Sequence, residues 1–194
     1  MRRHTAAFAA ICLGLLAGTP AAQAVTQEDI DILTKQRPVG EDGRPLAAAI
    51  PREVVNYDGP HKPGTIIIST VERRMYYILP NHQAVKYGVG VGRPGFEWSG
   101  VKVISRKQEW PSWTPPEQML KRRPDLPRFM PGGVANPLGA RALYLSSSLY
   151  RIHGSNEPQT IGQAVSSGCI RMTNDDVIDL YERARVGTRV VVLR

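Results

Sequence analysis

Cysteine is scarce in this chain of 194 residues, which contains only Cys12 and Cys169. Because Cys12 lies in an apolar N-terminal leader, removal of that leader would leave Cys169 with no partner in the chain. A fold held together by disulfides is therefore excluded. A zinc centre is poorly supported as well, since Cys169 and one well-placed histidine, His153, fall short of the three or four ligands that zinc takes. We expect no metal.

Long apolar segments are missing beyond the leader, whose apolar run covers residues 6–17. That run is shorter than the roughly 20 apolar residues that cross a bilayer. Arg2-Arg3 precedes it and Ala22-Gln23-Ala24 follows it, an order typical of a secretory signal peptide. We therefore expect a signal peptide over residues 1–24, an exported product and no integral membrane segment after cleavage. A buried N-terminal helix is the less favoured alternative.

Signals for phosphate or nucleic acid are missing too. The glycine-rich stretch GVGVGRPG, residues 88–95, lacks the G-x-x-x-x-G-K-[ST] pattern of a phosphate loop. Its spacing predicts a bending strand whose missing side chains let backbones approach. The net charge of +8, or +6 without the leader, favours anionic surroundings. The densest cationic cluster, residues 121–123, is more simply a solvated turn, so we expect no nucleic acid partner.

What the sequence does contain is a series of short β-branched and aromatic runs. Proline, asparagine and glycine separate them, which is typical of consecutive antiparallel strands. Near the C-terminus, apolar residues at helical spacing follow the capping sequence Thr173-Asn174-Asp175-Asp176, so we expect one short amphipathic helix before a last strand. The expected strands cover residues 65–69, 74–79, 83–89, 101–105, 142–145, 150–153 and 188–193.

Composition divides the chain into three parts. After the signal peptide, residues 25–63 are rich in proline, glycine and charge and are expected to form a tail or linker, with one short helix near residues 27–35. The tail either shields a sheet edge or extends away from the domain. Residues 64–194 are expected to form one mostly β domain.

Within this domain, the proline-rich residues 109–137 are too long for an ordinary connection, so we expect a lid or binding loop there. Trp110 and Trp113 serve in it either as anchors or as cleft walls.

Cys169 is a candidate nucleophile, because an exported protein rarely keeps an unpaired thiol without a use for it. His153 is the candidate base, and Gly168 allows a tight turn that aims backbone N–H groups at a substrate carbonyl. With the cation of Arg171 nearby, we expect a lowered pKa for the Cys169 thiol. The alternative is a buried cysteine that acts as a small apolar side chain.

These residues resemble a family signature. His153-Gly154, followed by residues 166–172 (SSGCIRM) and Asn174-Asp175-Asp176, is similar to the motif of L,D-transpeptidase catalytic domains of the YkuD type. The resemblance covers about residues 64–194. It implies a β-sandwich-like domain with a short helix near the C-terminus and a long Pro/Trp-rich loop. It also implies an exported enzyme of the bacterial periplasm that acts on peptidoglycan stem peptides and needs no cofactor.

The resemblance assigns roles to individual residues. Cys169 is the nucleophile, His153 is the general base and later the general acid, and the carbonyl of Gly154 orients the imidazole. The N–H groups of Gly168 and Cys169 form an oxyanion hole. Arg171 either holds a substrate carboxylate or braces its loop, and this choice stays open.

One position departs from the family pattern, since Ser167 stands where the motif often has a second histidine. Ser167, Ser155 and Trp113 complete the substrate-binding candidates. The expected reaction is attack of Cys169 on the third-residue carbonyl of a stem tetrapeptide, release of D-alanine and transfer to an amine, which gives a 3-3 crosslink. The alternatives are an L,D-carboxypeptidase, an enzyme that anchors envelope proteins to peptidoglycan, and a non-catalytic wall-binding module.

Overall fold

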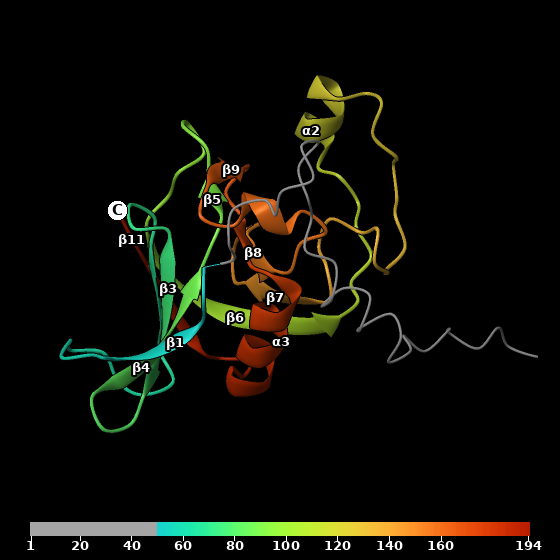
Figure 1. The fold of residues 1–194 in the computed structure, drawn as a ribbon. Coiled ribbons are helices and arrows are strands. Elements are labelled where there is room, and N and C mark those ends of the chain that lie inside the picture. The colour runs from blue at the N-terminus through green and yellow to red at the C-terminus, as the bar shows by residue number, and fades with distance from the viewer. Residues whose placement is uncertain (1–49) are drawn as a thin grey trace, which may run out of the picture.

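A computed structural model describes residues 50–194, so the predicted signal peptide and the helix expected at residues 27–35 lie outside the described part. Strands dominate the fold, as expected (Figure 1). The elements are β1 (Glu53–Asn56), β2 (Ile66–Ser69), β3 (Arg74–Leu79), β4 (Gln83–Gly88), β5 (Val91–Gly92), β6 (Gly100–Glu109), α2 (Glu117–Arg122), β7 (Arg141–Leu145), β8 (Arg151–His153), the 3-10 turn η1 (Pro158–Thr160), β9 (Ala164–Ser166), β10 (Ile170–Arg171), α3 (Asn174–Arg183) and β11 (Arg189–Leu193).

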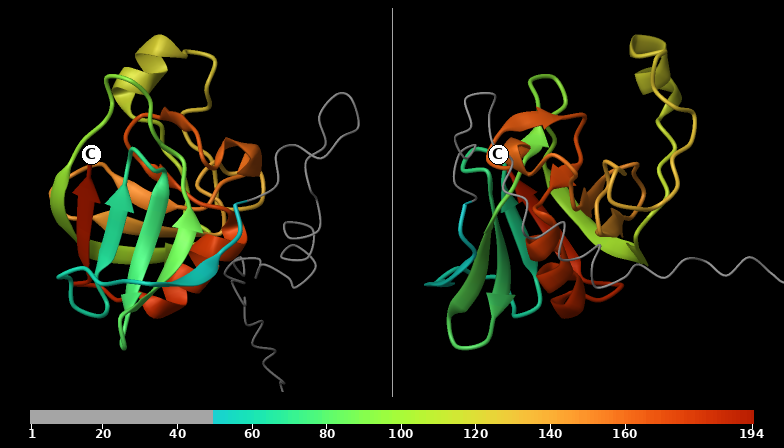
Figure 2. Two further views of the ribbon diagram at one scale, coloured as in Figure 1. Left: turned by 60° about the vertical axis from the view of Figure 1, so that its left-hand side comes forward. Right: turned by 45° about the vertical axis from the view of Figure 1, so that its right-hand side comes forward.

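A single curled sheet has the strand order β1-β4-β3-β2-β11-β6-β7-β8-β10. The long strand β6 joins its two halves, because its first residues pair with β11 and its last residues pair with β7. The register shifts between Ile104 and Arg106, where the sheet bends. The two halves therefore face each other, as Figure 2 shows, and the prediction of a mostly β domain with one short C-terminal helix is confirmed.

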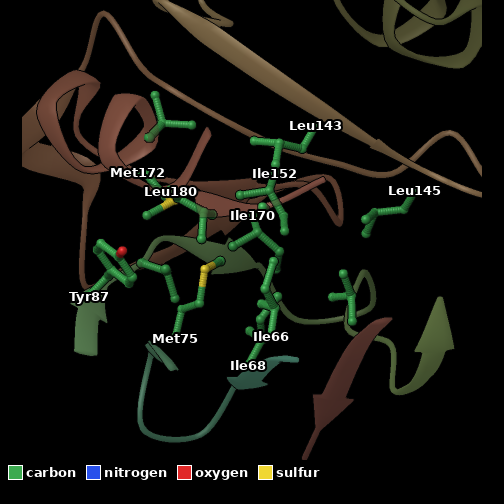
Figure 3. Close-up of a cluster of buried hydrophobic side chains, with 14 of the residues drawn as sticks. Ile66, Ile68, Met75, Tyr87, Leu143, Leu145, Ile152, Ile170, Met172 and Leu180 are labelled. Atoms are coloured by element: carbon green, nitrogen blue, oxygen red, sulfur yellow. The ribbon is translucent and has the colours of Figure 1, made fainter. Parts of the chain in front are cut away.

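The hydrophobic core fills the space between the two halves (Figure 3). Alternate residues of β2 point into it, so Ile66 and Ile68 are fully buried opposite Leu143 and Ile152 of the other half. Each such side chain contributes about 1.5–3 kcal/mol through its removal from water. The core thereby fixes the positions of β7 and β8.

Helix α3 begins where the capping sequence predicted. The Thr173 hydroxyl accepts a hydrogen bond from the N–H of Asp176 at 3.2 Å. At the other end, the Lys107 ammonium donates to the carbonyls of Tyr181 and Ala184 at 2.5 and 2.8 Å, which places a cation at the helix C-terminus. Both ends of α3 are thus held against the sheet.

The expected tail contributes a strand within the described residues. β1 pairs antiparallel with β4, with Val54 opposite Val85, and forms one edge of the sheet. Tyr57, just beyond β1, packs with a small buried cluster that includes Ile67 and Ile78. Residues 53–56 therefore extend the sheet beyond β4, and residues 25–49 of the expected tail lie outside the described part.

The glycine-rich bend brings backbones close together, as predicted. Gly90 and Arg171 exchange two backbone hydrogen bonds of 2.9 Å. A Cβ atom on Gly92 would lie 2.4 Å from the carbonyl oxygen of Phe96, so no side chain fits there. The bend leads into β5, which pairs in parallel with β9 and so supports the segment just before Cys169.

The long loop is closed at its base, where Trp113 and Met130 exchange two backbone hydrogen bonds of 2.8 Å. The short helix α2 lies within it and projects from the body of the domain (Figure 1). Within residues 50–194, no helix is both long and apolar enough to cross a membrane.

Candidate active site

His153 lies on β8, and Cys169 immediately precedes the neighbouring strand β10. β8 and β10 run parallel, with Ile152 opposite Ile170 and His153 opposite Arg171. Both isoleucines point into the core. Because side chains alternate along an extended chain, His153 and Arg171 point to the opposite face. Arg151 and Arg171 act on the pKa of both the His153 imidazole and the Cys169 thiol, so the two candidate groups lie near the same two cations.

The His153 ring is held in one orientation. Its Nδ1 lies 2.6 Å from the Gly154 carbonyl oxygen, so Nδ1 carries the proton and donates, and Nε2 is left with its lone pair. A Cβ atom on Gly154 would lie 2.3 Å from Oδ1 of Asn174, so only glycine fits at this position. The Asn174 side chain accepts from the N–H of Ala140 at 2.8 Å and donates to the carbonyl of Ser155 at 3.2 Å, which ties the start of α3 to this segment.

Burial controls the charge state of His153. It lowers the pKa of the imidazole to about 3, the neighbouring cations Arg171 and Arg151 act in the same direction, and the hydrogen bond to Gly154 opposes them. His153 is therefore neutral at neutral pH and able to accept a proton at Nε2.

The thiol of Cys169 differs from the expectation. Burial raises its pKa above the ordinary value, although Arg151 and Arg171 pull in the other direction. The sequence-based expectation of a lowered pKa was wrong because the neighbouring cations do not outweigh the loss of water around the sulfur. The Sγ atom lies 4.0 Å from the carbonyl oxygen of Leu149. Thiol and imidazole are thus both neutral in this state.

The turn before Cys169 requires glycine. Gly168 has a φ of 105°, and a Cβ atom there would lie 2.5 Å from the ring of Tyr150. The Ser166 hydroxyl accepts from the Gly168 N–H at 3.0 Å and donates to the Cys169 carbonyl at 2.6 Å. The Gly168 N–H was expected in an oxyanion hole and is instead engaged by Ser166. The Cys169 N–H makes no hydrogen bond within residues 50–194.

Sequence reasoning missed Trp98. Its indole N–H donates to the Gly168 carbonyl at 2.7 Å, and its ring stacks on Tyr150 with centroids 4.7 Å apart and an angle of 5° between the planes. Trp98 therefore holds the turn from the side opposite Ser166. It lies 70 residues from Gly168 in the chain, and a lone tryptophan after a glycine-rich bend gave no sign of this contact.

The expected substrate-binding side chains make contacts within the protein. Arg171 pairs with Glu157 at 2.8 Å. The Ser155 hydroxyl is buried and accepts from the N–H of Glu157 at 2.9 Å. The Ser167 hydroxyl accepts from the Arg93 guanidinium at 3.2 Å. These contacts favour the bracing role for Arg171.

Trp113 lies in the long loop, half-buried, with its backbone paired to Met130. The contact closes the base of the loop through the backbone, and the Trp113 side chain belongs to neither hydrophobic cluster of the described residues.

Two other features of the surface bear on the site. In the described part of the chain, no three His, Cys, Asp or Glu side chains gather so as to hold a metal ion. A hollow of about 620 Å³ opens beside β5 and β9, but neither Cys169 nor His153 lines it. Cys169 and His153 are therefore separate from this hollow. Its lining comprises Thr70, Val71, Arg73, Val91, Gly92, Pro94, Glu97, Ala164 and Arg194.

The curled β domain, with His153 on β8 and Cys169 just before β10, matches a known family of protein domains. The family model for the L,D-transpeptidase catalytic domain, YkuD, matches residues 63–192. The chain belongs to this family.

Individual relatives agree with this membership. The chain is 39% identical over 151 residues to the probable L,D-transpeptidase ErfK/SrfK of Escherichia coli, a match that covers 74% of this chain and 48% of that protein. The chain thus spans about half the length of the curated relatives it matches.

Solved structures share the fold. L,D-transpeptidase 3 from Mycobacterium tuberculosis has a TM-score of 0.55 at 14% identity, over 67% of this chain and 60% of that chain. A Brucella melitensis chain is 42% identical with a TM-score of 0.52, over 76% of this chain and 96% of that chain. That structure is named a probable carnitine operon oxidoreductase. In the present chain, the matched family region, residues 63–192, includes both Cys169 and His153.

Proposed function

We propose that this chain is an exported, cysteine-dependent L,D-transpeptidase that acts on peptidoglycan stem peptides. Membership of the family supplies the class of reaction. The proposal is supported by the register of β8 and β10, in which His153 pairs with Arg171 two residues after Cys169, and by the contact between Nδ1 and Gly154 that leaves Nε2 free. A buried cysteine that serves only as packing needs neither feature.

The first half of the reaction follows from these groups. As the third-residue carbonyl of a stem tetrapeptide approaches, the thiol proton passes to Nε2 of His153 and the sulfur bonds to the carbonyl carbon. The Cys169 N–H donates to the oxyanion that forms. When the oxyanion collapses, the amide bond to the terminal D-alanine breaks, and the imidazolium returns the proton to the departing amine. A thioester on Cys169 remains.

In the second half, an amine of another stem attacks the thioester carbonyl and gives its proton to His153. The carbon–sulfur bond breaks, the new amide forms, and the thiolate takes the proton back. One amide bond is lost and one is made, so the reaction needs no ATP, metal or organic cofactor.

The neutral resting pair suits an exported enzyme. A neutral thiol reacts slowly with oxidants and disulfides, because the thiolate is the nucleophile. Arg151 and Arg171 favour the thiolate, so they stabilise it once the substrate draws the proton away. We assign to the long loop, residues 109–137, the role of excluding water, which would convert transfer into hydrolysis.

The test is an incubation of the purified mature protein with a disaccharide-tetrapeptide, followed by mass analysis of the products. We expect a crosslinked dimer that lacks one D-alanine. Cys169→Ser should abolish product with an unchanged far-UV spectrum, while Ser105→Ala, an exposed change in β6, should leave it intact. Tripeptide alone would identify a carboxypeptidase, and stem remnants on envelope proteins an anchoring enzyme. Full activity of Cys169→Ser, or a folded protein whose thiol reacts with neither carbapenem nor alkylating reagent, would contradict the proposal.

A further inference from the structure

Arg151 lies beside the candidate nucleophile and has no acidic partner among residues 50–194. In the register of β8 and β10, Ile152 lies opposite Ile170. The residues just before them, Arg151 and Cys169, are therefore neighbours on the two adjacent segments. Arg151 and His153 are two residues apart in β8 and share a face. Arg151 therefore lies on the same face as His153.

The described surroundings of Arg151 leave its Nε atom without a hydrogen-bond partner. Its Nε is buried and makes no hydrogen bond, and within residues 50–194 no carboxylate lies within ion-pair distance of it. Arg171 on the same face is neutralised by Glu157 at 2.8 Å. The ring of Tyr144 is the contact that Arg151 does make, with the guanidinium carbon 5.5 Å from the ring centroid. A partly buried cation without a counter-ion carries a desolvation cost that an anionic ligand removes.

A second cation lies behind the first. Arg106 packs on the ring of Tyr144, with its guanidinium carbon 3.8 Å from the ring centroid. It donates to Gln108 at 2.8 Å, and Tyr144 donates to the same oxygen at 3.3 Å. Arg106 has no carboxylate partner among the described residues either. The row Arg106, Tyr144, Arg151 therefore gives the surface beside Cys169 a positive charge.

We propose that Arg151 binds a carboxylate of the donor peptide, namely the free carboxylate one residue beyond the attacked carbonyl. This inference rests on the proposed function, and it names the group by which the site selects a donor that ends one residue after the scissile bond. A guanidinium fits a carboxylate with two parallel hydrogen bonds. Only an amide nitrogen and one Cα separate that carboxylate from the attacked carbon, a span comparable to the roughly 4.8 Å between neighbouring strands.

The experiment measures binding, so that it is independent of turnover. In a Cys169→Ala background, calorimetry compares a disaccharide-tetrapeptide that ends in a carboxylate with the same compound ending in a carboxamide. A hydrogen-bonded charge pair predicts that the acid binds about 10–100-fold more tightly than the amide. Arg151→Gln should abolish this preference by weakening acid binding alone. Arg151→Lys should keep part of it, because the charge remains and the two-pronged geometry is lost.

A matched control and a second readout separate this role from others. Arg189→Gln removes an exposed arginine of β11 and should leave the preference unchanged. In the protein that retains Cys169, the rate of alkylation by iodoacetamide measures the reactivity of the thiol separately from peptide binding. Loss of acid and amide binding to the same extent in Arg151→Gln, or an equal affinity of the parent for both peptides, would overturn the inference. The inference would also be overturned if the preference depended on amidation of the third residue's side-chain carboxylate and not on the terminal carboxylate.

Failure of the proposed function has a different signature. A protein that binds the acid through Arg151 but forms no product and no carbapenem adduct would be a wall-binding module with this recognition intact. A protein that makes crosslinks with equal efficiency from the acid and the amide would keep the function and lose the inference.

Discussion

Acid should destabilise this protein through His153, because the folded state holds the imidazole neutral. Its pKa is about 3 in the fold and 6.5 in an ordinary setting. Unfolding therefore takes up a proton between these values, and the free energy of unfolding falls as the pH drops below the ordinary pKa. The contribution is fully lost only near the folded value.

The magnitude follows from the same two values. Linkage gives about 1.4 kcal/mol per pH unit inside the window, which makes about 2 kcal/mol between roughly pH 6 and roughly pH 4 after allowance for the upper end of the window. His153→Asn removes the titrating group and should flatten this part of the stability profile by that amount. Other carboxylates titrate in both proteins, so the difference between them isolates His153.

The assay is urea unfolding of the wild type and His153→Asn at several pH values from 6 to 4. His82→Asn is the matched control, because the His82 side chain is 84% exposed in a turn. It should lose stability in parallel with the wild type. Equal losses in the wild type and in His153→Asn would refute the claim that burial keeps the imidazole neutral, and direct NMR titration of the ring above about pH 5 would do the same.

Two further predictions test the support of the site. Trp98→Phe keeps the stack on Tyr150 and deletes the N–H that donates to the Gly168 carbonyl. We expect a loss of about 1 kcal/mol in unfolding free energy and slower carbapenem acylation of Cys169, measured by mass spectrometry. Acylation at the wild-type rate would show that the turn does not need this hydrogen bond. Thr173→Ala removes the cap of α3 and should cost about 1 kcal/mol by thermal or urea unfolding, whereas Thr173→Ser should retain most of it; equal stability of both variants would show that the hydroxyl contributes nothing.

The parts of the fold that the sequence predicted are those set by local chemistry. β2, β3 and β4 have bounds within about a residue of the predicted runs, because β-branched residues are interrupted by a sharp turn. Asn81 and His82 take φ values of 60° and 57° in that turn, which Asn tolerates well. The start of α3 was predictable for the same reason, since its cap lies in four consecutive residues.

The parts that were missed depend on distant partners. β5, β9 and β10 have two or three residues each, too few for a periodic pattern. They are strands because the Gly90 backbone meets that of Arg171 and β5 meets β9. The partner of Arg171 and the contact of Trp98 are likewise contacts between segments that no local pattern connects.

The charge state of the reactive pair shows why this limit matters for chemistry. The sequence analysis placed Arg171 near Cys169 and predicted a lowered thiol pKa, but the same fold that gathers Arg151 and Arg171 also removes water from the sulfur and from His153. Burial is the larger effect on both groups, so both are neutral at neutral pH, and the proposed reaction begins with transfer of the thiol proton to the imidazole. A ligand carboxylate held at Arg151 would reduce the positive charge near His153 and so raise its basicity. Substrate binding and base activation would then be linked, because Arg151 is one of the two cations that lower the pKa of the imidazole.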